Sequence, residues 1–285
     1  PNIFSVGYGG SVLAYDRNLA AGIPARDVPF LVEGNRARLD PDARAQIANA
    51  GFEQYDGHRL TGYGFHDRPG EVSFVDREVF KEGKASLRFQ DFGRYEHGHA
   101  RVMQEVAVRP HRCYRLSCHV KTEGLDSAGG FRIQVLTADG RELALFDPRI
   151  PSTTDWRHVV MGFNSLDYEI VRIYAGAWGG KAGRFWIDDL ELEEVGLLNV
   201  LRRPGTPVTV RDAKSGQIYE EGKDFAPIKD DRLNFQFDHE SPSIEILPGG
   251  RIQGGQRLSV SYYHGIAIYD GQVTICMSEP KPYEI

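Results

Sequence analysis

Two adjacent aspartates, Asp188 and Asp189, stand in an otherwise apolar stretch and are the residues best placed to do chemistry. The run from Trp186 to Glu193 alternates with a period of two, which predicts a β-strand. In this pattern Asp188 shares a face with Trp186, whereas Asp189 points to the opposite face. An unpaired acid inside such a strand is costly, so something must compensate it, and a bound cation is one candidate.

Five short patterns between residues 49 and 195 follow one another in a characteristic order. Gly51-Phe52-Glu53 opens the region and the run 186–193 closes it; between them stand a strand pattern at 79–89, a Y-x-L-S-x-x-V-K pattern at 114–121 and a W-x-x-V-x-x-x-F pattern at 156–163. Together they resemble the galactose-binding-like jelly rolls used as carbohydrate-binding modules. The resemblance is specific for the fold and less so for the ligand, because one fold hosts many functions.

The resemblance implies a structural calcium ion, Ca2+. In that family the Glu after the first Phe and an Asp of the closing strand often hold calcium. The corresponding residues of this chain are Glu53 and either Asp188 or Asp189. Calcium takes roughly six to eight oxygen ligands, and the resemblance implies that carbonyl groups of the turn 81–84 supply the remainder. The alternative is that Glu53 is an exposed turn residue and that the aspartates pair with Arg or Lys.

Four aromatic residues in loops between predicted strands are the candidate sugar platform, because sugars stack their apolar face on aromatic rings. They are Tyr63, Phe65, Tyr95 and Trp178. Glycines flank Trp178 and let a ligand approach the backbone; the alternative is a rim residue packed on a neighbouring loop. The polar partners expected beside these rings are His66, Asp67, Arg68, Arg94, His97 and His99.

Arg132 and Gln134 share one face of their predicted strand and would line a concave groove, an ordinary solvated face being the alternative. Sequence motifs for catalysis are missing from the chain: there is no G-x-S-x-G, Walker, HExxH or dinucleotide fingerprint. A convincing carboxylate pair for glycoside hydrolysis is missing as well. We therefore expect a non-catalytic unit, and enzyme activity stays undecided.

The whole chain reads as an all-β protein. Short strand signals recur from 49 to 195 with turns between them, and Asp139-Gly140 between two apolar runs predicts a hairpin. The predicted fold is a galactose-binding-like jelly-roll β-sandwich, followed by a smaller Ig-like β-sandwich and a C-terminal remnant of a βα unit. The segments 217–225 and 252–262 resemble accessory β-sandwiches that stand beside catalytic domains in polysaccharide-degrading enzymes.

The predicted domains follow from these signals and from the length of 285 residues. Residues 1–48 form an irregular segment that packs on a later domain, 49–196 the jelly roll, and 197–272 the small sandwich. Residues 273–285, an apolar strand followed by a helix start, are predicted to begin a truncated following domain that resembles the first βα unit of a (β/α)8 barrel.

The net charge and the hydropathy of the chain argue against some classes of binding partner. The net charge of −6 argues against nucleic acid, and the apolar runs are far shorter than the roughly 20 residues that span a bilayer. The expected partners are an oligo- or polysaccharide and a missing C-terminal catalytic-type domain, with a secreted or periplasmic location favoured. Two alternatives stay open: a structural scaffold without sugar binding, and a glycan-active enzyme with its site in the jelly-roll groove.

Overall fold

The computed structural model describes residues 3–7, 23–40, 47–94, 98–126, 130–202, 204–232, 237–265, 268–269 and 272–276. These residues form β-strands and one short 3-10 helix, η2 (Phe92–Arg94), and they contain no α-helix, which confirms the all-β prediction. None of their helices is long and apolar enough to cross a membrane. The helix start expected after residue 277 lies outside the described residues, as do Tyr95 and His97.

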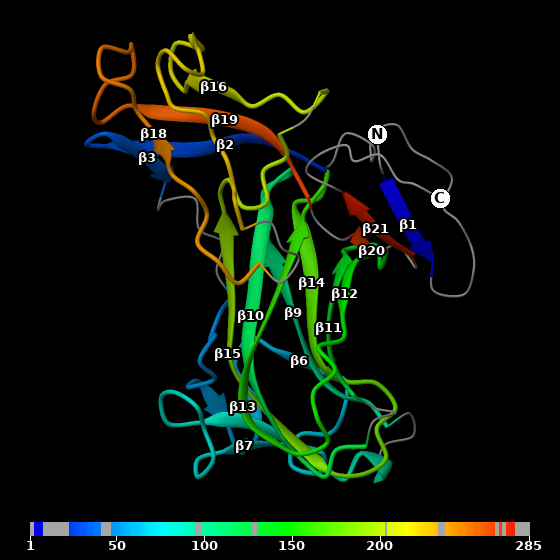
Figure 1. The fold of residues 1–285 in the computed structure, drawn as a ribbon. Helices are drawn as coiled ribbons and strands as arrows, with labels where there is room; N and C mark the ends of the chain where they lie inside the picture. Colours follow the sequence, from blue (N-terminus) through cyan, green and yellow to red (C-terminus); the bar gives the residue numbers. More distant parts are fainter. Residues whose placement is uncertain are drawn as a thin grey trace.

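Two antiparallel five-stranded sheets pack face to face and confirm the predicted β-sandwich (Figure 1). The first sheet has the order β13 (Thr154–Asn164), β10 (Cys113–Glu123), β15 (Arg184–Val195), β8 (Ser86–Gln90) and β7 (Ser73–Asp76). The second has the order β12 (Glu142–Phe146), β11 (Phe131–Thr137), β14 (Ile170–Ala177), β9 (Ala100–Ala107) and β6 (Gly64–Phe65). A separate hairpin pairs β4 (Tyr55–Asp56) with β5 (Arg59–Leu60).

Alternating apolar residues of the two sheets fill the space between them with one core. In β11 the residues Phe131, Ile133 and Val135 are buried, whereas the residues between them reach the outer face. The hairpin predicted at Asp139-Gly140 joins β11 to β12, and Gly140 has a φ of 88° that favours glycine. The strand pattern therefore fixes both the inner and the outer face of each sheet.

A β-bulge in β15 corrects the strict alternation expected for 186–193. The register between β10 and β15 shifts between Ser117 and His119, and Asp189 has a φ of 48°. Ile187 and Leu190 both enter the core as a result, while Trp186 is buried on the outer face of the sheet. The bulge also leaves Asp188 and Asp189 side by side at the surface-facing side of the strand.

A six-stranded antiparallel sheet forms the second module, in the order β17 (Ile218–Tyr219), β16 (Thr209–Asp212), β19 (Arg257–His264), β2 (Ile23–Glu33), β3 (Arg36–Leu39) and β18 (Ile244–Glu245). The N-terminal strands β2 and β3 therefore lie inside this sheet, because β2 pairs with β19. Isolated bridges from Phe225 to Glu221 and to Ile246 link the two ends of the sheet around a second core.

A further, three-stranded sheet holds β21 (Gln272–Cys276) between β1 (Ile3–Gly7) and β20 (Ile268–Tyr269), and its strands are all antiparallel. It lies to one side of the other two modules (Figure 1). The strand predicted near residue 273 is present as β21. Its assignment to a following domain stays a prediction, and so do the other domain boundaries.

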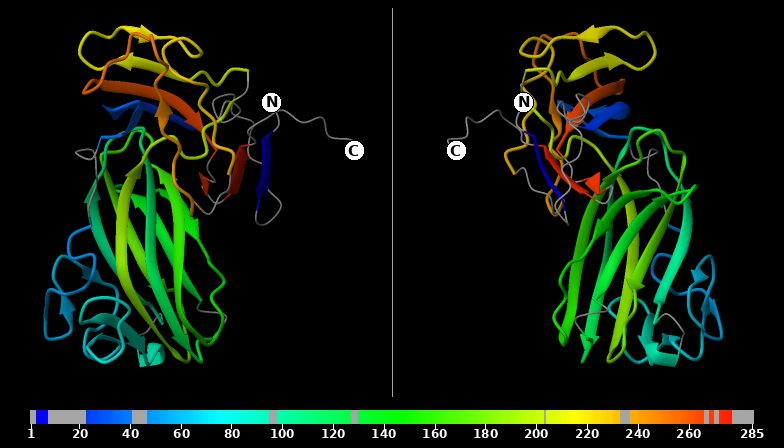
Figure 2. Two further views of the ribbon diagram at one scale, coloured as in Figure 1. Left: turned by 60° about the vertical axis from the view of Figure 1, so that its left-hand side comes forward. Right: turned by 90° about the vertical axis from the view of Figure 1, so that its right-hand side faces the viewer.

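The two large modules meet end to end, with β2 and β19 crossing one end of the sandwich (Figure 2). Phe237 of the second module packs in a small shared cluster with Ile23, Cys113, Val195 and Leu198. Buried polar contacts add to it: Asn164 Nδ2 lies 2.8 Å from His264 Nε2, and Arg112 Nε lies 3.2 Å from Glu194 Oε1. The junction is therefore packed by both apolar and polar side chains.

Candidate functional site

Several planar polar and aromatic side chains lie together on the outer face of the β12-β11-β14-β9-β6 sheet. Residues in direct register across a sheet share a face. Arg132 of β11 stands opposite Gly176 of β14, and Gly176 stands opposite Arg101 of β9. Two register pairs further along, and therefore on the same face, Gln134 stands opposite Tyr174, so a band of polar and aromatic side chains crosses three strands.

Arg101 organises the end of this face. Its guanidinium carbon lies 4.5 Å from the ring centroid of Trp178 and 5.7 Å from that of Tyr174, which places the cation over both aromatic rings. Its Nη2 lies 3.4 Å from Nδ1 of His66, and its Nη1 lies 3.5 Å from Nδ1 of His99. We call Arg101, Arg132, Tyr174, Trp178 and His66 the arginine–aromatic patch.

Charge and burial set the state of His66 in the patch. Desolvation lowers its pKa, and the positive charge of Arg101 lowers it further. The imidazole is therefore neutral at pH 7 and offers a ring nitrogen to the guanidinium. The ring also packs edge-on against Tyr174, with centroids 5.3 Å apart.

Gly176 lies at the centre of the patch and has to be glycine. Its φ is 145°, and a Cβ there would collide with the Ala100 carbonyl oxygen and with Arg101. The sheet consequently lacks a side chain between Arg101 and Arg132, which lets the Arg101 guanidinium lie across this point between the two rings.

The other predicted sugar-binding residues divide between the two faces of the sheet. Arg132 and Gln134 lie on the outer face, half-buried, with acidic neighbours: Arg132 Nε is 3.7 Å from Asp147 Oδ2, and Gln134 donates to Glu142. Tyr63 and Phe65 instead pack against the sandwich core. The structure therefore brings Trp178, Arg132 and Gln134 onto one surface, without Tyr63 and Phe65.

Tyr63 shows why its ring is directed inward. It meets Phe52 edge-on with centroids 5.4 Å apart, and its hydroxyl donates to the Asn49 carbonyl at 3.4 Å. Phe65 stands opposite Val102, whose side chain belongs to the core. A strand at the sheet edge was not expected at 64–65, and its period of two directs alternate residues inward.

The carboxylate of Asp188 is compensated by backbone N–H groups. Its Oδ2 accepts hydrogen bonds from Lys81 N at 2.7 Å and Glu82 N at 3.2 Å, and its Oδ1 accepts one from Asp189 N at 2.9 Å. Burial nevertheless raises its pKa to about 6. The loop between β7 and β8 thus folds onto the outer face of β15 through this one acid.

Glu53 holds the same loop from its other side. Its Oε1 accepts hydrogen bonds from Lys84 N at 2.7 Å and from Ala85 N at 3.3 Å. A Cβ on Gly83, which has a φ of 65°, would collide with this carboxylate. Glu53 and Asp188 therefore both bind this turn, whereas the Asp189 carboxylate lies 3.4 Å from His119 Nδ1, measured from Oδ2.

The donor set around this turn consists of hard oxygen atoms, which suits calcium. The loop amides already satisfy the carboxylates, however, and in the described part of the chain no three His, Cys, Asp or Glu side chains are arranged to hold a metal ion. Hydrogen bonding thus explains the buried Asp188 without a cation, and calcium stays a prediction.

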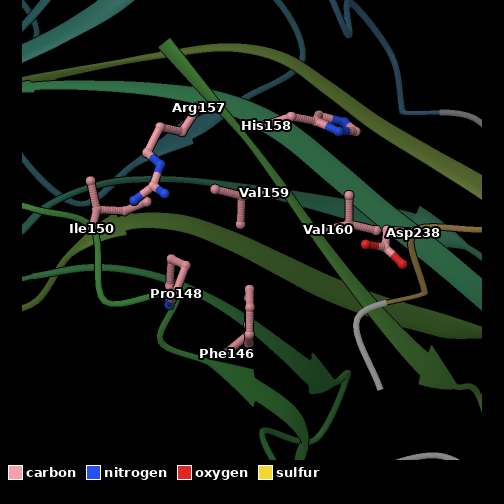
Figure 3. Close-up of a pocket in the computed structure, with 8 residues that line it drawn as sticks. All are labelled: Phe146, Pro148, Ile150, Arg157, His158, Val159, Val160 and Asp238. Carbon is pink, nitrogen blue, oxygen red and sulfur yellow. The ribbon is translucent and has the colours of Figure 1, made fainter. Parts of the chain in front are cut away.

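A pocket of about 360 Å³ opens at the edge of the sandwich where β12 and β13 face each other (Figure 3). Apolar side chains form most of its wall, and charged groups stand at its rim. Its lining residues are Phe146, Pro148, Ile150, Arg157, His158, Val159, Val160 and Asp238. It lies on the opposite edge of the sandwich from β6 and contains none of the predicted site residues.

Arg101 and Tyr174 of the patch were not among the site residues predicted from the sequence. Arg101 and Tyr174 stand in strands whose period-two pattern marks them as outward-facing. Their meeting with Trp178 depends on the pairing of β9 with β14, which no local pattern specifies. His66 was expected as a polar partner, and it lies beside Arg101.

Comparisons with known proteins give distant similarities only. No family model matches the chain, and no curated protein matches it. A structure of TmCBM61 in complex with beta-1,4-galactotriose aligns with a TM-score of 0.38 and 16% identity over 51% of this chain and 95% of its own. A CBM4 structure aligns with a TM-score of 0.38 and 14% identity over 52% and 99%, respectively.

A cyclase from Fischerella sp. TAU aligns with a TM-score of 0.42 and 18% identity, over 53% of this chain and 96% of its own. These matches cover about half of the chain. At such values they assign neither a family nor a ligand, and the function has to be argued from the site itself.

Proposed function

We propose that this chain is a non-catalytic glycan-binding unit whose binding surface is the outer face of the β12-β11-β14-β9-β6 sheet. The observation that carries the proposal is the arginine–aromatic patch. Trp178 is half-buried at the end of β14, and planar hydrogen-bonding groups of Arg101, Arg132 and Gln134 share its face. Aromatic faces and planar polar groups are the means by which proteins recognise sugar rings and hydroxyls.

The proposal is tested by titration calorimetry on the whole chain after a glycan array has selected ligands. Trp178→Ala should weaken binding strongly or abolish it. Trp156→Ala is the matched control, because Trp156 is also half-buried but stands on β13 of the opposite sheet. Equal binding by wild type and Trp178→Ala would remove this face from the site, and no binding to any glycan would favour the structural-scaffold alternative.

Affinity should be modest. A few contacts of about 1–2 kcal/mol each, after the cost of association, correspond to dissociation constants of roughly 10 µM to millimolar.

We also propose a structural calcium ion at the turn 81–84, with Glu53, Asp188 and Asp189 as its carboxylate ligands. Binding to the native state stabilises it by mass action, so a chelator should lower the melting temperature and Glu53→Ala should abolish that response. Glu71→Ala is a control, since Glu71 is an exposed acid paired with Arg68. Melting that does not change with chelator, from a preparation shown to be metal-free beforehand, would leave the loop amides as the whole explanation for Asp188.

The proposed function includes a neighbouring catalytic domain and a location in the cell. A unit of this kind acts beside a catalytic domain of a glycan-active protein, outside the cytoplasm. The resemblance of 217–225 and 252–262 to accessory β-sandwiches supports this placement.

A further inference from the structure

We infer that the arginine–aromatic patch selects negatively charged sugars and that Arg101 is the residue that binds their anionic group. The inference rests on the proposed function, because it names the class of glycan that the same face binds. Three observations carry it: the clustering of cations, the fixed position of the guanidinium, and the charge pattern along the face.

Cationic groups gather at one end of the sheet face. Arg101 and Arg132 flank Gly176 in register from the two neighbouring strands, which places their Cα atoms about 10 Å apart, two strand spacings. The acid beside Arg132 is Asp147, and this pair is half-exposed with a distance of 3.7 Å, so it is weak and open to exchange for a ligand anion.

Asp67 contacts Arg101 through the backbone. Its oxygens accept hydrogen bonds from the Ser73 hydroxyl and from the Arg101 backbone N–H at 3.1 Å. The neutral imidazole of His66 adds no positive charge directly beside the guanidinium, and a bound anion would favour its protonation.

The guanidinium is held before any ligand arrives. It lies against Trp178 and Tyr174, and ring nitrogens of His66 and His99 approach it at 3.4 and 3.5 Å. A flexible side chain fixed in this way loses little further freedom on binding. A planar guanidinium matches a carboxylate or sulfate with two parallel hydrogen bonds, which neutral sugars cannot offer.

The opposite end of the face has a different charge pattern. Arg172 is paired with Glu105, with 2.9 Å between Nε and Oε1. The net charge of the chain is −6, so long-range attraction does not bring an acidic glycan to the protein. Selection has to arise from contact at the Trp178 end, and added salt should weaken it only partly because the patch is half-buried.

The test compares matched oligosaccharides on the whole chain. A short oligogalacturonide is titrated beside the same oligosaccharide after its carboxyl groups are reduced, and a sulfated oligosaccharide is the third probe. We expect the charged forms to bind roughly tenfold or more tightly than the reduced form, as one charge-assisted hydrogen-bonded contact provides. Carboxylate and sulfate are distinguished by which of the two charged probes binds.

Arg101→Gln should remove the preference for the charged probes, and Arg101→Lys should restore only part of it because the fork of donors is lost. Arg132→Gln is a second variant in case Arg101→Gln disturbs the strand, and it should weaken the preference. Arg172→Gln is the matched control: an arginine on the same face, paired with Glu105, whose loss should leave the preference unchanged. Melting temperatures report whether each variant is folded.

The outcomes distinguish a preference for charged sugars from glycan binding in general. Preference for charged probes that disappears in Arg101→Gln or Arg132→Gln supports the inference. Equal binding of native and reduced oligosaccharides overturns it while leaving glycan binding intact. Binding of none of the probes, together with an empty glycan array, overturns both the inference and the proposed function.

Discussion

Asp188 shows how one buried carboxylate orders a loop. Three backbone N–H groups, from Lys81, Glu82 and Asp189, donate to its two oxygens. The loop that they anchor covers the outer face of β15, where Trp186 donates from Nε1 to Asp76 at 2.9 Å. A single acid thus connects the closing strand of the sandwich to the turn that Glu53 holds from its other side.

Replacing this acid should therefore destabilise the sandwich. Asp188→Ala leaves the amides of Lys81 and Glu82 without an acceptor, at a cost of about 1–3 kcal/mol in the free energy of unfolding. Asp188→Asn keeps one carbonyl oxygen and should cost less. Urea denaturation measures both. A loss in Asp188→Ala below about 0.5 kcal/mol, as for an ordinary surface substitution, would show that the loop is held by other contacts.

At the scale of elements, β21 stands apart from the two large modules. In the described residues it pairs only with β1 and β20, and its apolar sequence makes it an aggregation risk when unpaired. The cores of the sandwich and of the six-stranded sheet are built from residues between 25 and 262. We therefore expect both cores to fold without β21.

Deleting residues 273–285 should leave both large modules folded. Circular dichroism and the melting temperature of the shortened chain should match those of the full chain, because the described core side chains of both modules lie between residues 25 and 262. Loss of the thermal transition of the second module would show that β21 supports it and would end the interpretation of this segment as the start of a following domain.

At the scale of the whole molecule, side-chain contacts join the six-stranded module to the sandwich. The ring of Phe237 lies so close to Gly162 of β13 that a Cβ at this glycine would stand 2.6 Å from ring carbons. Arg115 adds hydrogen bonds to the carbonyl oxygens of Phe237 and His239 at 3.2 and 3.1 Å. The second module is thus seated on the edge strand of the sandwich.

Gly162→Ala should push the Phe237 ring away from β13 and lower the free energy of unfolding by about 1–3 kcal/mol, the usual cost of overpacking. The double variant Gly162→Ala/Phe237→Ala should be less destabilised than the sum of the two single variants, because the residues touch. Additive effects in this double-mutant cycle would contradict a direct contact between them.

His264 makes the junction sensitive to acid. Burial lowers its pKa to about 3, against 6.5 in the unfolded chain. Between these values the unfolded chain binds a proton that the folded chain does not, so the free energy of unfolding falls as the pH drops below 6.5, by up to about 1.4 kcal/mol per pH unit. Burial raises the pKa of Glu194 to about 7, which acts in the opposite direction.

The difference between wild type and His264→Gln isolates this effect, since Glu194 contributes to both proteins. The glutamine keeps an acceptor for Asn164 and does not titrate. Urea denaturation between pH 7.5 and 4.5 should show a shallower loss of stability in His264→Gln. Parallel curves for the two proteins would show that His264 does not stay neutral in the folded state.

The sequence by itself determined the all-β class, the outward position of Arg132 and Gln134, and the hairpin at Asp139-Gly140, because these depend on period-two alternation and on local turn chemistry. It could not determine that Asp189 sits in a bulge, since the extra residue is defined only against its partner strand. The inward position of Tyr63 and Phe65 likewise depends on where β6 joins the sheet.

Only the tertiary structure placed Arg101 over Trp178, and β2 in the same sheet as β19. Both results depend on pairings between segments far apart in the chain. Local propensity and alternation say which face of a strand is buried, but the choice of partner strand is decided by how all the apolar faces are buried together.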